Sequence, residues 1–128
     1  MTRDEIERLE GRELDYWVSR RVFGETQDWH EEHPGLGLCE GCFPRWSWFL
    51  DRAWQVAQRM AELGYGLDIF ELSLPAGHPD KPTCSLAFGK DRVELGTNRY
   101  TDSDIARAIC RAALIALASE EAERNADA

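Results

Sequence analysis

The chain has 128 residues, enough for one domain with a single hydrophobic core and too few for two. Its 24 acidic residues outnumber its 15 basic ones, and the net charge of −9 disfavours sequence-independent binding to nucleic acid phosphates. The hydrophobic fraction of 43% excludes a disordered chain. No apolar run approaches the ~20 residues that span a bilayer, and the charged N-terminus is unlike an export signal. We therefore expect one globular domain over residues 1–128.

The first segment has the pattern of an interrupted helix. Thr2 and Glu5 have the spacing of a capping box, which predicts a helix start. Apolar residues then recur every three or four positions as far as about Phe23. Gly11 is expected to interrupt this region and Gly24 to end it.

A second helix is predicted between Ser47, a favourable cap, and Gly64. Seven apolar residues trace its expected buried face: Leu50, Ala53, Trp54, Ala57, Met60, Ala61 and Leu63. This pattern assigns Trp54 to the core.

Three short strands are predicted over residues 67–96. The first alternates so that Phe70 and Leu72 face the core, and the second presents Cys84, Leu86 and Phe88 on one face. A short turn then leads into a third strand, which carries Val93 and Leu95. Strands joined by such short connections form an antiparallel meander.

The last helix is predicted to be capped by Thr101 and to bury a wide apolar face between Ile105 and Ala116. Residues 120–128 are expected to fray. A small sheet needs an apolar partner on each apolar face. The fold class is therefore predicted as α+β, an α-β-α sandwich with a three-stranded antiparallel sheet between helices.

Several segments resemble the phage ABA sandwich family of small phage proteins. The similar segments are residues 1–6, 11–15 and 22–24, Ala-Trp-Gln-Val at 53–56, and Ala-Ile-Cys-Arg-Ala-Ala-Leu at 108–114. The sequence departs from the family at Phe49, where an Asp is usual, and in a longer Cys- and His-bearing insertion at residues 25–45. The resemblance implies an α-β-α fold and a phage or prophage origin, and hence the cytoplasm of a bacterial host. It implies no catalytic residue.

The insertion has the ligand spacing of a zinc site. His30, His33, Cys39 and Cys42 place four nitrogen and sulfur ligands close together among Gly and Pro residues. Four protein ligands close a tetrahedral sphere, which is typical of structural zinc. The alternatives are a substitute ligand such as Cys84 or His78, or no metal, while a disulfide is uncommon inside cells.

The remaining candidates concern binding rather than catalysis, since the sequence has no nucleophile elbow, no phosphate-cradling Gly-rich loop and no His-Glu-x-x-His motif. Cys84 and Cys110 fall on apolar faces and are expected in the core. Trp46 and Trp48 flank the exit of the insertion, where a Trp can anchor a partner. Four acidic residues near the N-terminus form a second candidate surface that could imitate nucleic acid charge: Glu5, Glu10, Glu13 and Asp15.

The sequence therefore favours a phage accessory protein with a structural zinc, which binds and modulates a protein partner. A host-defence component inhibited during infection is one candidate partner. A small metal-dependent hydrolase that uses the Cys/His loop is the first alternative. A zinc-knuckle nucleic acid binder is the second, and the net charge argues against it.

Overall fold

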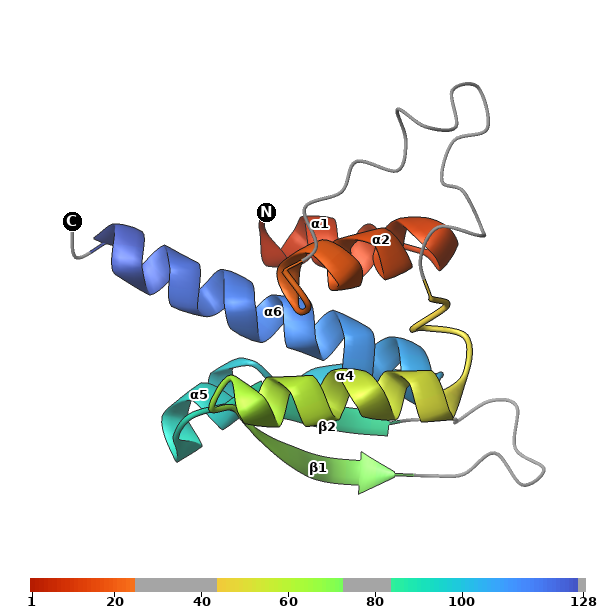
Figure 1. The fold of residues 1–128 in the computed structure, drawn as a ribbon. Helices are drawn as coiled ribbons and strands as arrows, with labels where there is room; N and C mark the ends of the chain where they lie inside the picture. The colour runs from red at the N-terminus through yellow and green to blue at the C-terminus, as the bar shows by residue number, and fades with distance from the viewer. Residues whose placement is uncertain (25–43, 73–83, 127–128) are drawn as a thin grey trace.

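A computed structural model describes residues 1–24, 44–72 and 84–126 (Figure 1). It shows an α+β fold in which helices pack on a three-stranded antiparallel sheet, and this coarse architecture confirms the sequence prediction. The chain order is α1 (Arg3–Arg8), α2 (Gly11–Arg21), α4 (Leu50–Glu62), β1 (Gly66–Leu72), β2 (Cys84–Gly89), α5 (Arg92–Thr97), β3 (Tyr100–Asp102) and α6 (Ile105–Ala126).

Helix α6 is the centre of the molecule. It contacts α1 and α2 on one side, and α4 and the sheet on the other (Figure 1). Its first half is rich in alanine and buried all round, as expected for a helix with neighbours on every side. Small side chains let the neighbouring elements approach closely, so one helix organises the whole core.

The N-terminal region follows the predicted pattern. Thr2 and Glu5 form the complete capping box at the start of α1. The helix breaks after Leu9 and resumes at Gly11, whose φ of +55° lies in the left-handed region that favours glycine. Gly24, with φ of +68°, follows the end of α2.

Helix α4 begins at Leu50, later than predicted, because Ser47 has a different role. The Ser47 backbone N–H and hydroxyl both donate to Asp15 on α2, at 2.8 and 2.7 Å, so Ser47 ties the chain to α2 instead of capping α4. The buried face consists of Ala53, Val56, Ala57 and Met60. The predicted core position of Trp54 is therefore wrong: its side chain is 50% exposed.

The sheet has the order β1-β2-β3, and both pairings are antiparallel. The first two strands lie where the sequence predicts them. The predicted third strand is wrong, because Val93 and Leu95 belong to helix α5. The Asp91 side chain caps that helix by accepting a hydrogen bond from the Glu94 backbone N–H at 2.8 Å. The third strand follows it.

Strand β1 contains a bulge, and its apolar side chains are more exposed than predicted. Ile69 pairs with Leu86, and Leu72 pairs with Cys84, so Phe70 is the additional residue in the bulge. Leu86 and Phe88 are fully buried, as predicted. The predicted burial of Phe70 and Leu72 is wrong, since they are 40% and 45% exposed.

The C-terminal helix differs from the prediction at both ends. Thr101 lies in β3, and the Asp104 side chain caps α6 by accepting from the Arg107 backbone N–H at 2.9 Å. The helix continues past Ser119 to Ala126, over most of the segment expected to fray. Along the described parts of the chain, no helix is both long and apolar enough to cross a bilayer.

Candidate functional site

The four predicted zinc ligands, His30, His33, Cys39 and Cys42, lie outside the described residues, as does His78. Of the candidate ligands only Cys84 is described, and its side chain is buried in the core, as is that of Cys110. Residues 1–24, 44–72 and 84–126 contain no group of three or more His, Cys, Asp or Glu that could hold a metal ion. The zinc site thus stays a prediction.

The two tryptophans that follow the insertion have opposite environments. Trp46 is only 5% exposed; its indole N–H donates to the Ser19 hydroxyl at 2.9 Å, and its ring stacks on Phe23 with centroids 4.4 Å apart. Trp46 is therefore a core residue and not part of an accessible surface. Trp48 is 52% exposed, with the Arg45 guanidinium 4.5 Å from the centre of its ring.

The four acidic residues proposed as a binding surface do not share one environment. Glu5, Glu10 and Glu13 are exposed, and Glu5 also belongs to the capping box of α1, whereas the fourth residue differs. Asp15 is completely buried, so it cannot contribute to an accessible acidic surface. Sequence periodicity misses this position because an Asp on a helix is ordinarily solvated.

Asp15 instead fixes the chain ahead of α4. Its carboxylate accepts both hydrogen bonds from Ser47 and pairs with Arg12 at 3.2 Å. Burial raises the pKa of Asp15 above its ordinary value, and the opposing hydrogen bonds and the Arg12 charge do not fully offset that effect. Together with the bond from Trp46 to Ser19, this carboxylate holds residues 46–48 against α2.

The most prominent accessible feature is a group of large apolar side chains at the start of α4. We call it the α4 apolar surface; its members are Trp48, Phe49, Leu50 and Trp54, each at least half exposed. Leu50 and Trp54 also line a shallow depression with Ile105 from α6, and Asp51, Gln55 and Gln58 contribute polar atoms around it. A Trp in an apolar hollow with a polar surround is the usual composition of a protein-binding hot spot.

The sequence contains a signal for this surface that the helical pattern obscures. Ala53, Val56, Ala57 and Met60 already form a complete buried stripe at helical spacing. Trp54 lies outside that stripe and is surplus to the core. A helix with more large apolar residues than one face can bury presents the remainder to solvent.

Strand β1 extends the apolar character beside α4. The two elements lie side by side and run in opposite directions (Figure 1). Ile69 and Leu72 share the helix-facing side of the sheet with their partners on β2, yet both side chains are more than 40% exposed. In the part of the chain that the structure describes, β1 is an edge strand that pairs only with β2.

A buried polar cluster at the other edge of the sheet has a structural role. Asp102 accepts hydrogen bonds from the Tyr100 hydroxyl at 2.7 Å, from Arg107 at 2.6 Å and from Arg111 at 2.9 Å. Arg111 also donates to the Leu9 carbonyl at 2.6 Å, which joins β3 and α6 to the end of α1. Every charge in the cluster is partnered, so it serves as a cross-link rather than a reactive group.

The electrostatics of the cluster follow from these contacts. Burial alone raises the pKa of Asp102, but the hydrogen bonds from Arg107 and Tyr100 outweigh it and hold the pKa well below its usual range. Burial and the Asp102 carboxylate raise the pKa of Tyr100 to about 12. The carboxylate stays charged and the phenol stays neutral at physiological pH, so neither is suited to proton transfer there.

Comparisons of this chain with protein-family models, with curated proteins and with solved structures found no significant match.

Proposed function

We propose that this chain is a non-catalytic binding protein whose α4 apolar surface docks on a protein partner. The observation that supports the proposal most strongly is the half exposure of Trp48, Phe49, Leu50 and Trp54 within one short stretch. Large apolar side chains that gather on a surface, rather than occurring singly, are typical of interaction sites. Burial of a Trp side chain also contributes strongly to binding, because its area is large and its rotamers are few.

The packing beneath this surface favours recognition by a preformed site. Trp46 and Asp15 anchor residues 46–48 to α2 through buried hydrogen bonds. The side chains that project from this stretch therefore start from a fixed backbone. A fixed backbone lowers the entropy cost of binding, since less motion is lost in the complex.

The partner is expected to offer an apolar, protein-like surface with a basic margin. The protein carries a net charge of −9, and Asp51 lies beside the apolar depression. Repulsion disfavours nucleic acid, and the same charge speeds encounter with a basic protein. A host-defence component that binds nucleic acid has this character, and its inhibition during phage infection is the role we propose.

The proposal includes two elements that come from the sequence. One is a structural zinc held by His30, His33, Cys39 and Cys42, and the other is the ABA sandwich resemblance, with its phage origin and helices on both faces of the sheet. In this role the zinc orders the segment that leads into Trp46 and Trp48. A hydrolase that uses the Cys/His loop and a zinc-knuckle nucleic acid binder remain the competing hypotheses.

Affinity capture from bacterial extract tests the proposal. We expect the full chain to retain a defined protein, and the double substitution Trp48→Ser with Trp54→Ser to lose it. The matched control is Val93→Ser, which removes an apolar side chain that is 78% exposed on α5, away from the α4 apolar surface. Equal retention by all three proteins would contradict this assignment.

A second variant separates hydrophobic docking from charge imitation. Glu10→Gln with Glu13→Gln neutralises two exposed acidic residues of the first helical region and leaves the capping box of Thr2 and Glu5 intact. We expect this variant to keep the partner at moderate salt. Loss of the partner in this variant alone would favour nucleic acid mimicry, and turnover of a small molecule without any retained protein would favour the enzyme.

A further inference from the structure

Strand β1 (Gly66–Leu72) has an unpaired edge in the described part of the sheet. It pairs only with β2 there, so alternate residues of β1 direct their backbone N–H and C=O groups away from the sheet. Pairing with β2 is regular from Gly66 to Ile69, ahead of the bulge at Phe70. All residues of the strand except Leu67 are exposed, and β1 lies along the lower side of the molecule in Figure 1. The edge is therefore accessible to a second extended chain.

The two sides of β1 differ in character. Ile69 and Leu72 lie on the helix-facing side, and both are exposed. Asp68 and Glu71 alternate with them in the pairing with β2, so these acidic residues lie on the opposite side, where both are also exposed. A chain added to this edge would meet an apolar row on one side and an acidic row on the other.

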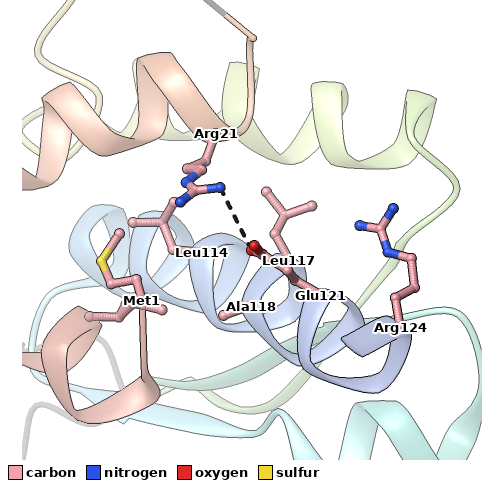
Figure 2. Close-up of a pocket in the computed structure, with 8 residues that line it drawn as sticks. Met1, Arg21, Leu114, Leu117, Ala118, Glu121 and Arg124 are labelled. Carbon is pink, nitrogen blue, oxygen red and sulfur yellow. Dashed lines mark ion pairs between the residues drawn. The ribbon is translucent and has the colours of Figure 1, made fainter. Parts of the chain in front are cut away.

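Asp68 has no ion-pair partner among the described residues, unlike other acids at the surface. Glu121, for example, pairs with Arg21 at 3.6 Å, as Figure 2 shows. Arg99 lies on the acidic side of β1, but its guanidinium donates to the Ser85 hydroxyl at 2.6 Å. Asp68 therefore retains a negative charge that a basic side chain of a binding partner can neutralise.

A second copy of this chain fits the edge poorly. Residues 66–72 hold two acidic residues and no basic one, so pairing of β1 with β1 would gather two carboxylates from each copy at one junction. The net charge of −9 on each chain adds to this repulsion. Charged side chains on an edge strand commonly prevent self-association, and they leave the edge open to a chain of opposite charge.

We propose that β1 pairs with an extended segment of the protein partner in which apolar and basic residues alternate. Its apolar side chains would lie beside Ile69 and Leu72, on the same side as α4, and its basic side chains beside Asp68 and Glu71. In this mode of recognition the main-chain hydrogen bonds provide affinity and the alternating side chains provide specificity. The inference rests on the proposed function, since it states how the partner of the α4 apolar surface is held.

A synthetic peptide as long as β1, in which Lys and Val alternate, tests the pairing without the partner itself. Hydrogen exchange of the full chain, resolved by NMR, is compared with and without the peptide. We expect saturable binding and new protection of backbone amides within residues 66–72, because added main-chain hydrogen bonds slow exchange. The same peptide N-methylated at two adjacent central residues, whose N–H groups point to opposite edges, should bind at least about tenfold more weakly.

Charge reversal tests the acidic side of the strand. Asp68→Lys should weaken binding of the Lys/Val peptide about three- to tenfold and should strengthen binding of a Glu/Val peptide of the same length. The matched control is Glu123→Lys, which makes the same change of net charge at an exposed position near the end of α6, away from β1 (Figure 1). This control should change the affinity less than about twofold. Circular dichroism confirms that both variants remain folded.

The inference and the proposed function fail separately. An absence of saturable binding, equal affinity for the N-methylated peptide, or equal effects of Asp68→Lys and Glu123→Lys would overturn the inference. Protection of residues 66–72 that rises with protein concentration in the absence of peptide would assign the edge to a second copy and overturn it as well. Peptide protection of β1, together with equal affinity capture by wild type and the Trp48→Ser, Trp54→Ser variant, would support the pairing and contradict the proposed function alone.

Discussion

At the scale of single residues, two buried aspartates hold the molecule together in different ways. Asp15 fixes the segment ahead of α4 through Ser47, and Asp102 joins β3 to α6 through Arg107 and Arg111. A buried carboxylate is tolerated only where donors surround it. Each aspartate is therefore expected to be sensitive to substitution, although neither lies at a binding surface.

Substitution of Asp15 tests its role as an acceptor. Asp15→Ala removes the partner of the Ser47 N–H and hydroxyl and should cost ~1–3 kcal/mol of unfolding free energy. Asp15→Asn keeps one carbonyl oxygen for Ser47 and should cost clearly less. Urea unfolding at neutral pH measures both values, and equal losses in the two variants would contradict the role we assign to the oxygen atoms.

The two aspartates should respond to acid with opposite signs. The pKa of Asp102 is lowered in the folded state, so the stability it contributes is present above its ordinary pKa of 3.8 and is lost as the pH falls through the lower folded value. The pKa of Asp15 is raised, so its contribution is present below 3.8 and is lost as the pH rises through the higher folded value.

Asn substitutions separate these contributions. Asp102→Asn should flatten the loss of stability on acidification below about pH 4. Asp15→Asn should instead steepen the loss of stability on acidification above about pH 4, because the variant lacks the proton uptake that favours the folded wild type in that range. Urea unfolding at several pH values between 2 and 6 provides the measurement. If the unfolding free energies of wild type and Asp102→Asn depend on pH in the same way, the hydrogen bonds of Asp102 do not lower its pKa in the folded state, and our account of this residue is wrong.

At the scale of elements, local rules predicted the starts and stops that depend on a few neighbouring residues. The Thr2 capping box, the break at Gly11 and the burial of Leu86 and Phe88 all follow from spacing alone. Val93 and Leu95 did not reveal their helix, because two apolar residues in so short a segment fit a strand equally well. Asp91, whose side chain caps α5, is the residue in the sequence that signals the start of this helix.

Tertiary contacts account for the other differences. The bulge inserts Phe70 into β1 as an extra residue, so Ile69 and Leu72 lie on the same side of the sheet, and the position of β1 at the edge of the described sheet leaves both of them exposed. Likewise, Asp15 holds Ser47 at α2, which no rule for helix caps could anticipate. In the candidate site, helical spacing alone predicted that Trp54 is buried. The structure shows that Ala53, Val56, Ala57 and Met60 already fill the buried face of α4, so Trp54 lies outside the core.

The exposure of Leu72 on β1 can be tested by paired truncations. Leu72 is 45% exposed, so Leu72→Ala should cost less than about 1 kcal/mol, as surface substitutions usually do. Leu86→Ala in the adjacent strand removes a fully buried side chain and should cost ~2–5 kcal/mol. Chemical unfolding of both variants gives the comparison, and similar large losses would place Leu72 in the core after all.

At the scale of the whole molecule, the organisation around α6 separates a compact core from its accessible surfaces. The core cluster includes residues from both helical sides and from the sheet, so it does not depend on the proposed zinc ligands. We expect one zinc per chain by elemental analysis of protein prepared without chelator. Cys39→Ser should release the metal and leave the circular dichroism of the remaining domain almost unchanged.

The central claim is that the α4 apolar surface is where a protein partner docks. Hydrogen exchange of the full chain, measured alone and in complex with the captured partner, tests it most directly. Our account predicts new protection of backbone amides in residues 48–58, with no change across residues 4–13. Protection confined to residues 4–13, with residues 48–58 unchanged, would contradict it.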